Sequence, residues 1–291
     1  MKRTCFLLLF SFFLSVCQLH AQKLLVGGSG WDTIVIVDKE SKKIEWKYPL
    51  EKDWECNSVA TTPDGNILFS YRKGAKLITK DKTDLWNIVA PAGCEMQSAT
   101  VLPNGNCLIA WCGSPAVIME VGKDGGILSK TEFDTHIENP HAQFRQIIKN
   151  KKGNYIVPLF ETSSICEINI DGKIIKRTPL EGDPFSAAPL KNGNYLVACG
   201  DAHCYKEVNL ETGKVVRTIR QNDIEGAKLF FVAQLLPSDN GYTYICNWLG
   251  HKPNDSIQYP SLIEIDETGK MVWCIDDTEI LKRVSSVSII Q

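Results

Sequence analysis

The sequence predicts an all-β protein, a six-bladed β-propeller of four-stranded antiparallel blades whose ring is closed by the C-terminal strand joining the N-terminal blade. Three observations predict this fold. A glycine-centred turn recurs five times, a second polar turn follows each copy, and a lone apolar segment ends the chain. Repeats of about 40 to 50 residues are typical of propeller blades, each of which is one supersecondary unit.

The first turn joins two apolar segments, as in TTPDGNILFS and VLPNGNCLIA. A tight hairpin turn needs a residue with positive φ, which glycine and asparagine tolerate best. The turn glycines are Gly65, Gly105, Gly153, Gly193 and Gly241, at successive spacings of 40, 48, 40 and 48 residues. This nearly constant spacing indicates five copies of one unit.

The sixth unit is divided between the two ends of the chain. Residues 23–49 contain three strand-like segments, KLLVGGS, TIVIVDKE and KKIEWKYPL, without a preceding first strand. Residues 284–290 (VSSVSII) lie near the position expected for a sixth repeat. We expect this segment to be the innermost strand of blade 1, because pairing there leaves no free sheet edge at the join.

The segments after the first turn are continuously apolar, as in ILFSY, CLIAW and YLVACG. Strands covered on both faces have this pattern, which fits blades packed face to face. The only helix expected is a short one near residues 278–283.

The N-terminus resembles a secretory signal peptide. Lys2 and Arg3 precede a short apolar run, and Ala21 precedes a polar start, so we expect cleavage after residue 21. The apolar run is too short for an ordinary membrane span. A lipoprotein signal ending at Cys17 is the alternative. The mature chain is then one propeller domain, residues 22–291. We expect it to be secreted or periplasmic, with no membrane span, and under the lipoprotein alternative it is lipid-anchored.

Charge and cysteine content exclude several classes of function. The formal net charge is −2, which gives no indication of the basic face that nucleic-acid binding usually requires, so we expect no nucleic-acid partner. Eleven cysteines include Cys5 and Cys17 of the leader, so nine remain and at least one cannot pair within the chain. Several lie in apolar strands as small hydrophobic side chains. A Cys56–Cys94 disulfide is possible, and no cysteine has zinc-finger spacing, so we expect no metal site.

The motifs LPNGNCLIA and DETGKMVW resemble propeller repeats of the PQQ-like quinoprotein and arylsulfotransferase-type superfamily, and more distantly WD40 and NHL repeats. The resemblance implies the fold, and packing between blades for Trp46, Trp86 and Trp273. It implies no activity. Quinoprotein dehydrogenases have eight blades and adjacent cysteines over the cofactor, and neither feature is present here. We therefore expect no cofactor and transfer no catalytic residue.

The predicted topology collects the unusual side chains on one face of the ring. The loops between the second and third strands of each blade share that face with the starts of the innermost strands. Aromatic rings beside amides and charges suit carbohydrates and other small polar ligands. The candidate ligand-binding residues on this face are Trp31, Asn57, Arg72, Gln97, Trp111, Gln143, Asp201, His203, Asn247, Trp248 and His251.

Three residues of one blade are candidates for catalysis: His141 as a base, Arg145 as an anion clamp and Glu161 as an acid. Two functions therefore stay open. One is a non-catalytic binding module, monomeric, for a small polar molecule, a glycan or an extracytoplasmic protein. The other is a hydrolase, lyase or transferase acting on a sugar or sulfated substrate at the channel mouth.

Overall fold

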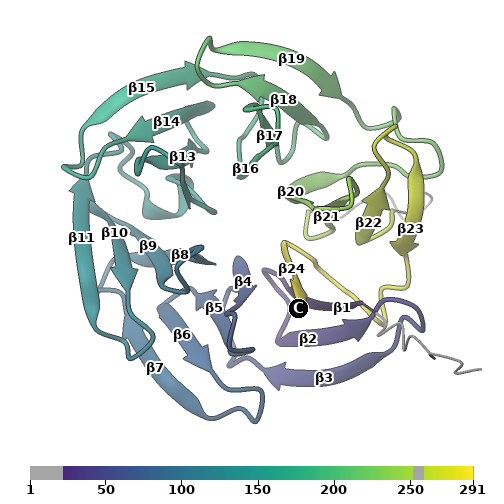
Figure 1. The fold of residues 1–291 in the computed structure, drawn as a ribbon, viewed down its shortest axis with the longest axis horizontal. Coiled ribbons are helices and arrows are strands. Elements are labelled where there is room, and N and C mark those ends of the chain that lie inside the picture. The colour runs from purple at the N-terminus through teal and green to yellow at the C-terminus, as the bar shows by residue number, and fades with distance from the viewer. Residues whose placement is uncertain (1–21, 252–258, 291) are drawn as a thin grey trace, which may run out of the picture.

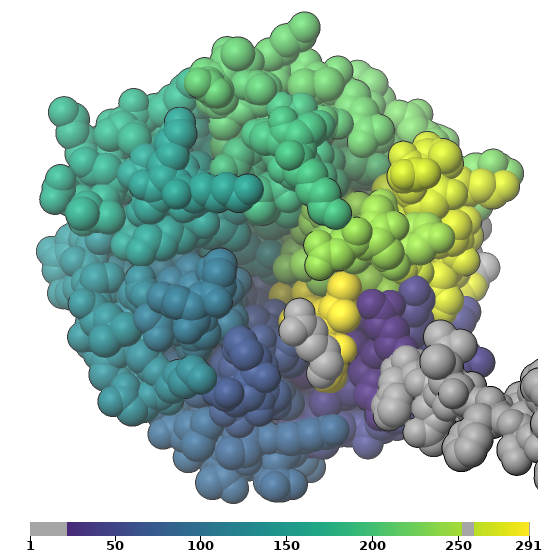
Figure 2. All heavy atoms as spheres, in the orientation of Figure 1, coloured from purple at the N-terminus to yellow at the C-terminus, as the bar shows by residue number. Residues whose placement is uncertain are grey.

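The computed structural model describes residues 22–251 and 259–290, so the leader expected at residues 1–21 lies outside the described residues. Six four-stranded antiparallel sheets stand around a central axis like the blades of a propeller (Figure 1). The predicted all-β fold and the predicted blade count are both confirmed. The space-filling view shows the middle of the ring hollowed between the blades (Figure 2).

The blades are numbered in chain order, and each is given from its innermost to its outermost strand. Blade 1 consists of β24 (Ser286–Ile290), β1 (Lys23–Gly27), β2 (Thr33–Asp38) and β3 (Ile44–Pro49). Blade 2 consists of β4 (Ser58–Thr61), β5 (Ile67–Tyr71), β6 (Gly74–Ile78) and β7 (Asp84–Val89). Blade 3 consists of β8 (Glu95–Val101), β9 (Cys107–Cys112), β10 (Ala116–Val121) and β11 (Ile127–Phe133).

The second half of the ring repeats this order. Blade 4 consists of β12 (Ile148–Lys149), β13 (Tyr155–Leu159), β14 (Ser164–Ile168) and β15 (Ile174–Pro179). Blade 5 consists of β16 (Ser186–Pro189), β17 (Tyr195–Ala198), β18 (Tyr205–Asn209) and β19 (Lys214–Ile219). Blade 6 consists of β20 (Phe231–Pro237), β21 (Thr243–Trp248), β22 (Leu262–Ile265) and β23 (Met271–Ile275).

The ring closes as predicted, through the last strand of the chain. β24 pairs antiparallel with β1, from Lys23 opposite Ile290 to Gly27 opposite Ser286. The same strand is tied to both neighbouring blades, because the Val59 amide donates to Ser286 Oγ over 3.0 Å and the Val287 amide donates to Gln234 Oε1 over 2.6 Å. The C-terminal strand is therefore hydrogen-bonded to β1 and to both neighbouring blades.

The turn glycines have the conformation that the repeat requires. Gly65 has φ of 79° and Gly105 has φ of 84°, and the Gly65 amide donates to the Thr62 carbonyl over 2.9 Å. An ideal Cβ at Gly65 would meet nothing within 4 Å. The demand for glycine there comes from the backbone angle and not from crowding.

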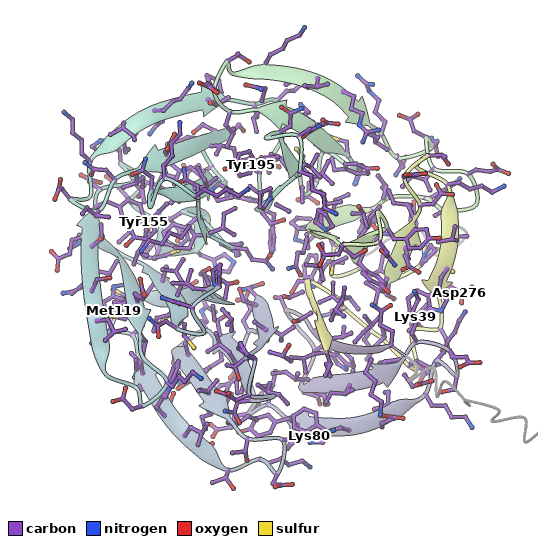
Figure 3. All side chains as sticks on the ribbon, in the orientation of Figure 1. Lys39, Lys80, Met119, Tyr155, Tyr195 and Asp276 are labelled. Atoms are coloured by element: carbon purple, nitrogen blue, oxygen red, sulfur yellow. The ribbon has the colours of Figure 1, made fainter. Side chains whose placement is uncertain are left out.

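Apolar side chains fill the layers between neighbouring blades, among them the buried Met119 and Tyr155 (Figure 3). The outer tryptophans also fasten one blade to the next. Trp46 Nε1 donates to the Lys80 carbonyl over 2.8 Å, and Trp273 Nε1 donates to the Lys39 carbonyl over 3.0 Å. The second bond joins blade 6 to blade 1, which supports the expected packing role between blades.

Two local expectations differ from the structure. The helix expected near residues 278–283 is a single turn, in which the Ile280 and Leu281 amides donate to the Asp277 carbonyl before the chain extends toward β24. A 3₁₀ helix not predicted from the sequence, Pro140–Ala142, is capped by the Asn139 side chain. Within the described residues, no helix is long and apolar enough to cross a membrane.

Candidate functional site

A cavity of about 240 Å³ opens at one mouth of the central channel. Strand starts and loops of five blades line it: Ser29, Glu55, Asn57, His141, Ala142, Arg145, Phe160, Phe185, Asp201, Phe231, Trp248, His251 and Ser285. Deeper in the channel, a second space is lined by the next residues of the inner strands, including Ser58, Ser186 and Ser286. The cavity therefore lies at the starting ends of the inner strands, on the face that the sequence predicts.

The repeat explains why these residues meet. Asn57, Arg145 and Phe185 each lie eight positions before the turn glycine of their blade. The pocket also takes residues from second-to-third-strand loops, including Asp201 and His251, and Trp248 from the end of β21. Equivalent positions of different blades converge on the axis, so a spacing along the chain becomes a cluster in space.

One side of the cavity is aromatic. The Trp248 ring packs edge-on against the rings of Phe231 and His251, with centroids 5.2 and 4.8 Å away. Trp248 Nε1 donates to the Ser29 carbonyl over 2.8 Å, which holds the indole in place. Beside it, His251 Nδ1 lies 2.9 Å from Asp201 Oδ1. This side offers a fixed apolar surface with a polar edge.

The opposite side is organised around the Glu95 carboxylate. Glu95 Oε2 lies 2.8 Å from His141 Nδ1, and Arg72 Nε donates to Glu95 Oε1 over 2.9 Å. Gln97 Nε2 donates to Glu95 Oε2 over 2.8 Å. These contacts connect blades 2, 3 and 4 and fix the position of the His141 ring.

The environment of Glu95 changes its acidity. Burial by itself would raise the pKa of this carboxyl, but hydrogen bonds from His141 and Arg72 outweigh burial and lower the pKa to about 2. Glu95 is therefore ionised at neutral pH. Its negative charge is used within the protein and is not presented to the cavity.

Arg145 brings a cation into the cavity wall. Arg145 NH1 donates to the carbonyls of His141 and Phe144 over 2.7 and 3.1 Å, and NH2 lies 3.2 Å from His141 Nε2. The guanidinium lies over the rings of Phe160 and Phe185, 5.8 and 5.9 Å from their centroids. Because Nδ1 of His141 faces a carboxylate and Nε2 faces a guanidinium, the arrangement fits an imidazole that donates at Nδ1 and accepts at Nε2.

Asn57 forms the floor between the two sides. Its Nδ2 donates to Gln97 Oε1 over 2.6 Å and to Glu55 Oε1 over 3.2 Å. Ser29 Oγ donates to the same Glu55 oxygen over 3.0 Å. Within the part of the chain that the structure describes, the buried Asn57 Oδ1 has no hydrogen-bond partner.

A shallower groove of about 530 Å³ continues from the cavity past Ser29, Glu55, His141 and Trp248. It is lined by the predicted residues Trp31 and Arg72, together with Trp54 and acidic residues of the 51–55 segment. Trp31 is itself buried in the core of blades 1 and 6. The groove extends the site outward over blades 1 and 2.

The predicted ligand-binding residues therefore divide into three groups. Asn57, Asp201, Trp248 and His251 line the cavity, and Trp31 and Arg72 line the groove. The other five line neither space and make contacts within the fold: Gln97, Trp111, Gln143, His203 and Asn247.

The side chains of this third group have structural partners. Trp111 packs in the apolar layer of blades 2 and 3. Gln143 Nε2 donates to the carbonyls of Gly113 and Ile137 over 2.9 and 2.8 Å. The fully buried Asn247 Oδ1 accepts from the Phe230 amide over 2.6 Å. His203 Nδ1 lies 2.7 Å from the Phe230 carbonyl, and its ring stacks on the Phe230 ring.

Of the three catalytic candidates, His141 and Arg145 line the cavity together, whereas Glu161 is exposed and is not among the lining residues. The carboxylate that contacts His141 is Glu95. Sequence reasoning missed Glu95 and Glu55, although a signal was present. ECNS and EMQS place a glutamate two residues before Asn57 and Gln97, one repeat apart.

Cys56 and Cys94 do not pair. All nine cysteines of the described residues are free thiols. Cys56 packs in the layer between blades 1 and 2, whereas Cys94 packs against the layer between blades 2 and 3. Equivalent positions of neighbouring blades occupy successive layers, which separates the two thiols.

Comparison with known proteins places this chain in a family. Residues 18–270 match the model of the family described as Mal s 1 allergenic protein-like. The chain belongs to this family. No match to the sequence was found among curated proteins. The family match, together with the structural similarities below, agrees with the repeat-level resemblance to propellers found in the sequence.

Solved structures are similar over nearly the whole propeller. A protein of unknown function from Bacteroides caccae is 58% identical, with a TM-score of 0.91, over 93% of this chain and 99% of that chain. A streptogramin B lyase is 14% identical, with a TM-score of 0.61, over 88% and 80% of the two chains. The WD40 propeller domain of Doa1 is 15% identical, with a TM-score of 0.60, over 91% and 82%. The last two similarities show the shared fold alone.

Proposed function

We propose that this protein is an extracytoplasmic binding module that takes a compact, carbohydrate-like ligand bearing an acidic group into the cavity at the channel mouth. The buried guanidinium of Arg145 carries the proposal. Arg145 is 7% exposed, and within the described residues it forms no ion pair. Buried charges are usually paired, so an anionic group of a ligand is the natural partner for this cation.

The shape of the cavity supports a small ligand. Its volume of about 240 Å³ is below the range of about 300 to 1,000 Å³ typical of drug-sized ligands. The Trp248 and Phe231 rings offer an apolar surface for one face of a sugar ring, and Asp201 and His251 offer polar groups beside it. The leader expected at residues 1–21 supports a location outside the cytoplasm.

The test is calorimetric titration of residues 22–291 with D-glucuronate and D-galacturonate, each beside its neutral sugar. We expect binding of an acidic sugar and weaker or no binding of the neutral one. Arg145→Gln removes a charge-assisted contact, and such contacts contribute about 1.5 to 3 kcal/mol, so affinity should fall about 10- to 100-fold. Trp248→Ala should also weaken binding.

Arg217→Gln is the matched control. This arginine bonds Glu207 from the outer strand β19, far from the cavity, so its loss should leave affinity unchanged. If neither acidic nor neutral sugars bind, the small-ligand proposal fails and an extracytoplasmic protein partner takes its place. Equal loss of affinity in both arginine variants would also contradict the assignment of the site.

Catalysis is the second candidate, because His141 is held in the cavity by Glu95. A ligand anion that draws Arg145 away would free His141 Nε2 to accept a proton, as a hydrolase, lyase or transferase requires. The fold shared with a streptogramin B lyase is compatible with this candidate. His141→Ala should then abolish product formation while ligand binding persists. If wild-type protein returns a bound sugar unchanged, the binding function stands alone.

A further inference from the structure

Two cysteines face each other across the hairpin that joins β17 to β18. Ala198 is the register partner of Tyr205, which places Cys199 opposite Cys204 at the next position. The Cys199 amide donates to the Cys204 carbonyl over 3.1 Å. Directly opposed residues of antiparallel strands have Cα atoms about 4.5 to 5.5 Å apart. That separation lies within the range of about 4.4 to 6.8 Å that a disulfide spans.

The side chains of this pair are also directed at each other. The two thiols interact directly, and both lie in the apolar layer of blades 4 and 5. Cys199 Sγ also lies 3.6 Å from the Val197 carbonyl, and three other buried cysteines have similar oxygen contacts: Cys56 with the Ser58 carbonyl, Cys112 with the Phe144 carbonyl and Cys246 with Gln234 Oε1. What distinguishes Cys199 and Cys204 is that each lies directly opposite a second cysteine across a hairpin.

We propose that Cys199 and Cys204 form an intramolecular disulfide when the protein meets a thiol–disulfide oxidant outside the cytoplasm. The Cys204 thiolate attacks one sulfur of the oxidant's disulfide, forms a mixed disulfide and releases one thiolate of the oxidant. Cys199 then loses its proton and attacks the Cys204 sulfur, which releases the second thiolate. Two protein thiols are oxidised, one oxidant disulfide is reduced to two thiols, and the protons pass to the released thiolates.

The local electrostatics fit this order of attack. The hydrogen bond from the Cys199 thiol, with help from the charge of Lys206, lowers the pKa of Cys204. The same hydrogen bond and burial raise the pKa of Cys199. Cys204 is also the more accessible thiol, 6% exposed where Cys199 is 0% exposed. Thiolate character and access are what make a cysteine the attacking group.

The bond would hold a segment that contributes to the cavity. The hairpin carries Asp201, which lines the cavity and lies 2.9 Å from His251. Gly200 exchanges backbone hydrogen bonds with Val232 over 3.1 and 3.3 Å, so the base of the hairpin is already fixed to blade 6. A covalent link between residues 199 and 204 would restrain the Asp201 turn itself.

To test this, residues 22–291 are exported to the oxidising periplasm of a bacterial host and purified. The protein is then denatured, and its free thiols are labelled with N-ethylmaleimide. Peptide mapping by mass spectrometry then counts the labels. We expect seven labelled cysteines of the nine, with Cys199 and Cys204 in one cross-linked peptide. Dithiothreitol before labelling should restore all nine. Closure of a six-residue loop predicts that reduction lowers Tm by about 4 °C.

Single variants give the matched comparison. Cys199→Ser and Cys204→Ser should each leave every remaining cysteine labelled. Cys166→Ser, which removes a buried cysteine of β14, should keep the 199–204 cross-link. Labels on both Cys199 and Cys204 without reduction would overturn the proposal, and so would a cross-link from either cysteine to another partner. The wild-type map decides the question even if a serine variant fails to fold.

Discussion

Replacement of Glu95 by glutamine tests the central claim about the site, that one buried carboxylate organises its cationic side. Glu95→Gln keeps the size of the side chain but removes the charge that His141 and Arg72 share. The side chain of Glu95 is 13% exposed, but those of Arg72 and His141 are 47% and 43% exposed, so solvent partly screens both contacts. The His141 ring would then lose the partner that fixes its orientation, and the contact between His141 Nε2 and Arg145 NH2 would weaken.

The magnitude follows from the acidity of the group. The pKa of Glu95 falls from an ordinary 4.5 to about 2. Each pKa unit corresponds to about 1.4 kcal/mol, which sets an upper bound of about 3 kcal/mol on the contribution of the ionised carboxylate to the free energy of unfolding. Solvent screening of the half-exposed partners reduces this contribution to about 1 to 2 kcal/mol. A lowered pKa in the folded state means that this contribution is present above pH 4.5 and is lost as the pH falls toward 2. The folded state binds the proton less readily than the unfolded state does.

Urea unfolding of wild-type protein and Glu95→Gln, measured from pH 7 down to pH 3, isolates the contribution. The difference in free energy of unfolding should be about 1 to 2 kcal/mol at pH 7 and should shrink steadily below pH 4.5. Glu132→Gln is the control, because Glu132 is half-exposed in a surface ion pair with Lys130 and such pairs contribute about 0 to 1 kcal/mol. A Glu95→Gln difference below about 0.5 kcal/mol at pH 7, or one that does not change with pH, would refute the reasoning.

Three further predictions concern the scaffold. Deletion of residues 284–291 should abolish cooperative unfolding or lower Tm steeply, because burial of Val284 and Val287 alone contributes about 3 to 6 kcal/mol and the β1 edge loses its partner. Trp273→Phe should cost about 1 kcal/mol in urea unfolding, because the Lys39 carbonyl loses its indole donor. Asn247→Ala should cost about 3 kcal/mol, because it leaves two buried backbone groups and one half-buried carbonyl without their partner.

The controls for these changes lie nearby. Val272→Ala, on the exposed side of the same strand as Trp273, should change stability by less than about 0.5 kcal/mol. Asn104→Ala, at an exposed turn, should do the same. An unchanged Tm after the deletion would contradict ring closure by β24. Equal effects of Trp273→Phe and Val272→Ala would contradict the fastening role of the indole.

Part of the site was predictable from the repeat, and part was not. Counting eight residues back from each turn glycine gave Asn57 and Arg145, which both line the cavity. The same method gave Gln97, which is fully buried and joins Asn57 to Glu95 instead. A repeat position defines a height along the channel, but the length and direction of the side chain decide whether it reaches the open space.

Position in a loop predicted the cavity-lining residues less well than position in the repeat did. Trp111 and Trp248 both lie within the last two positions of the second strand of their blades, yet Trp111 packs into an inter-blade layer and Trp248 lines the cavity. Glu161 shares a blade with His141, yet the carboxylate on His141 comes from blade 3. The partner of a side chain at a blade boundary belongs to the neighbouring blade, and a single chain segment contains no information about that neighbour.

The sequence by itself determined the number of blades, the turn positions and the closure of the ring, because hairpin turns and buried strands depend on local chemistry. Glycine at positive φ and continuous apolar strands are visible one segment at a time. Only the tertiary structure decided that Glu95, His141 and Arg145 meet, that Arg145 is buried in the cavity wall, and that Cys199 faces Cys204. Those contacts depend on the packing of blades against one another and on side-chain direction, which arise only when the whole ring is assembled.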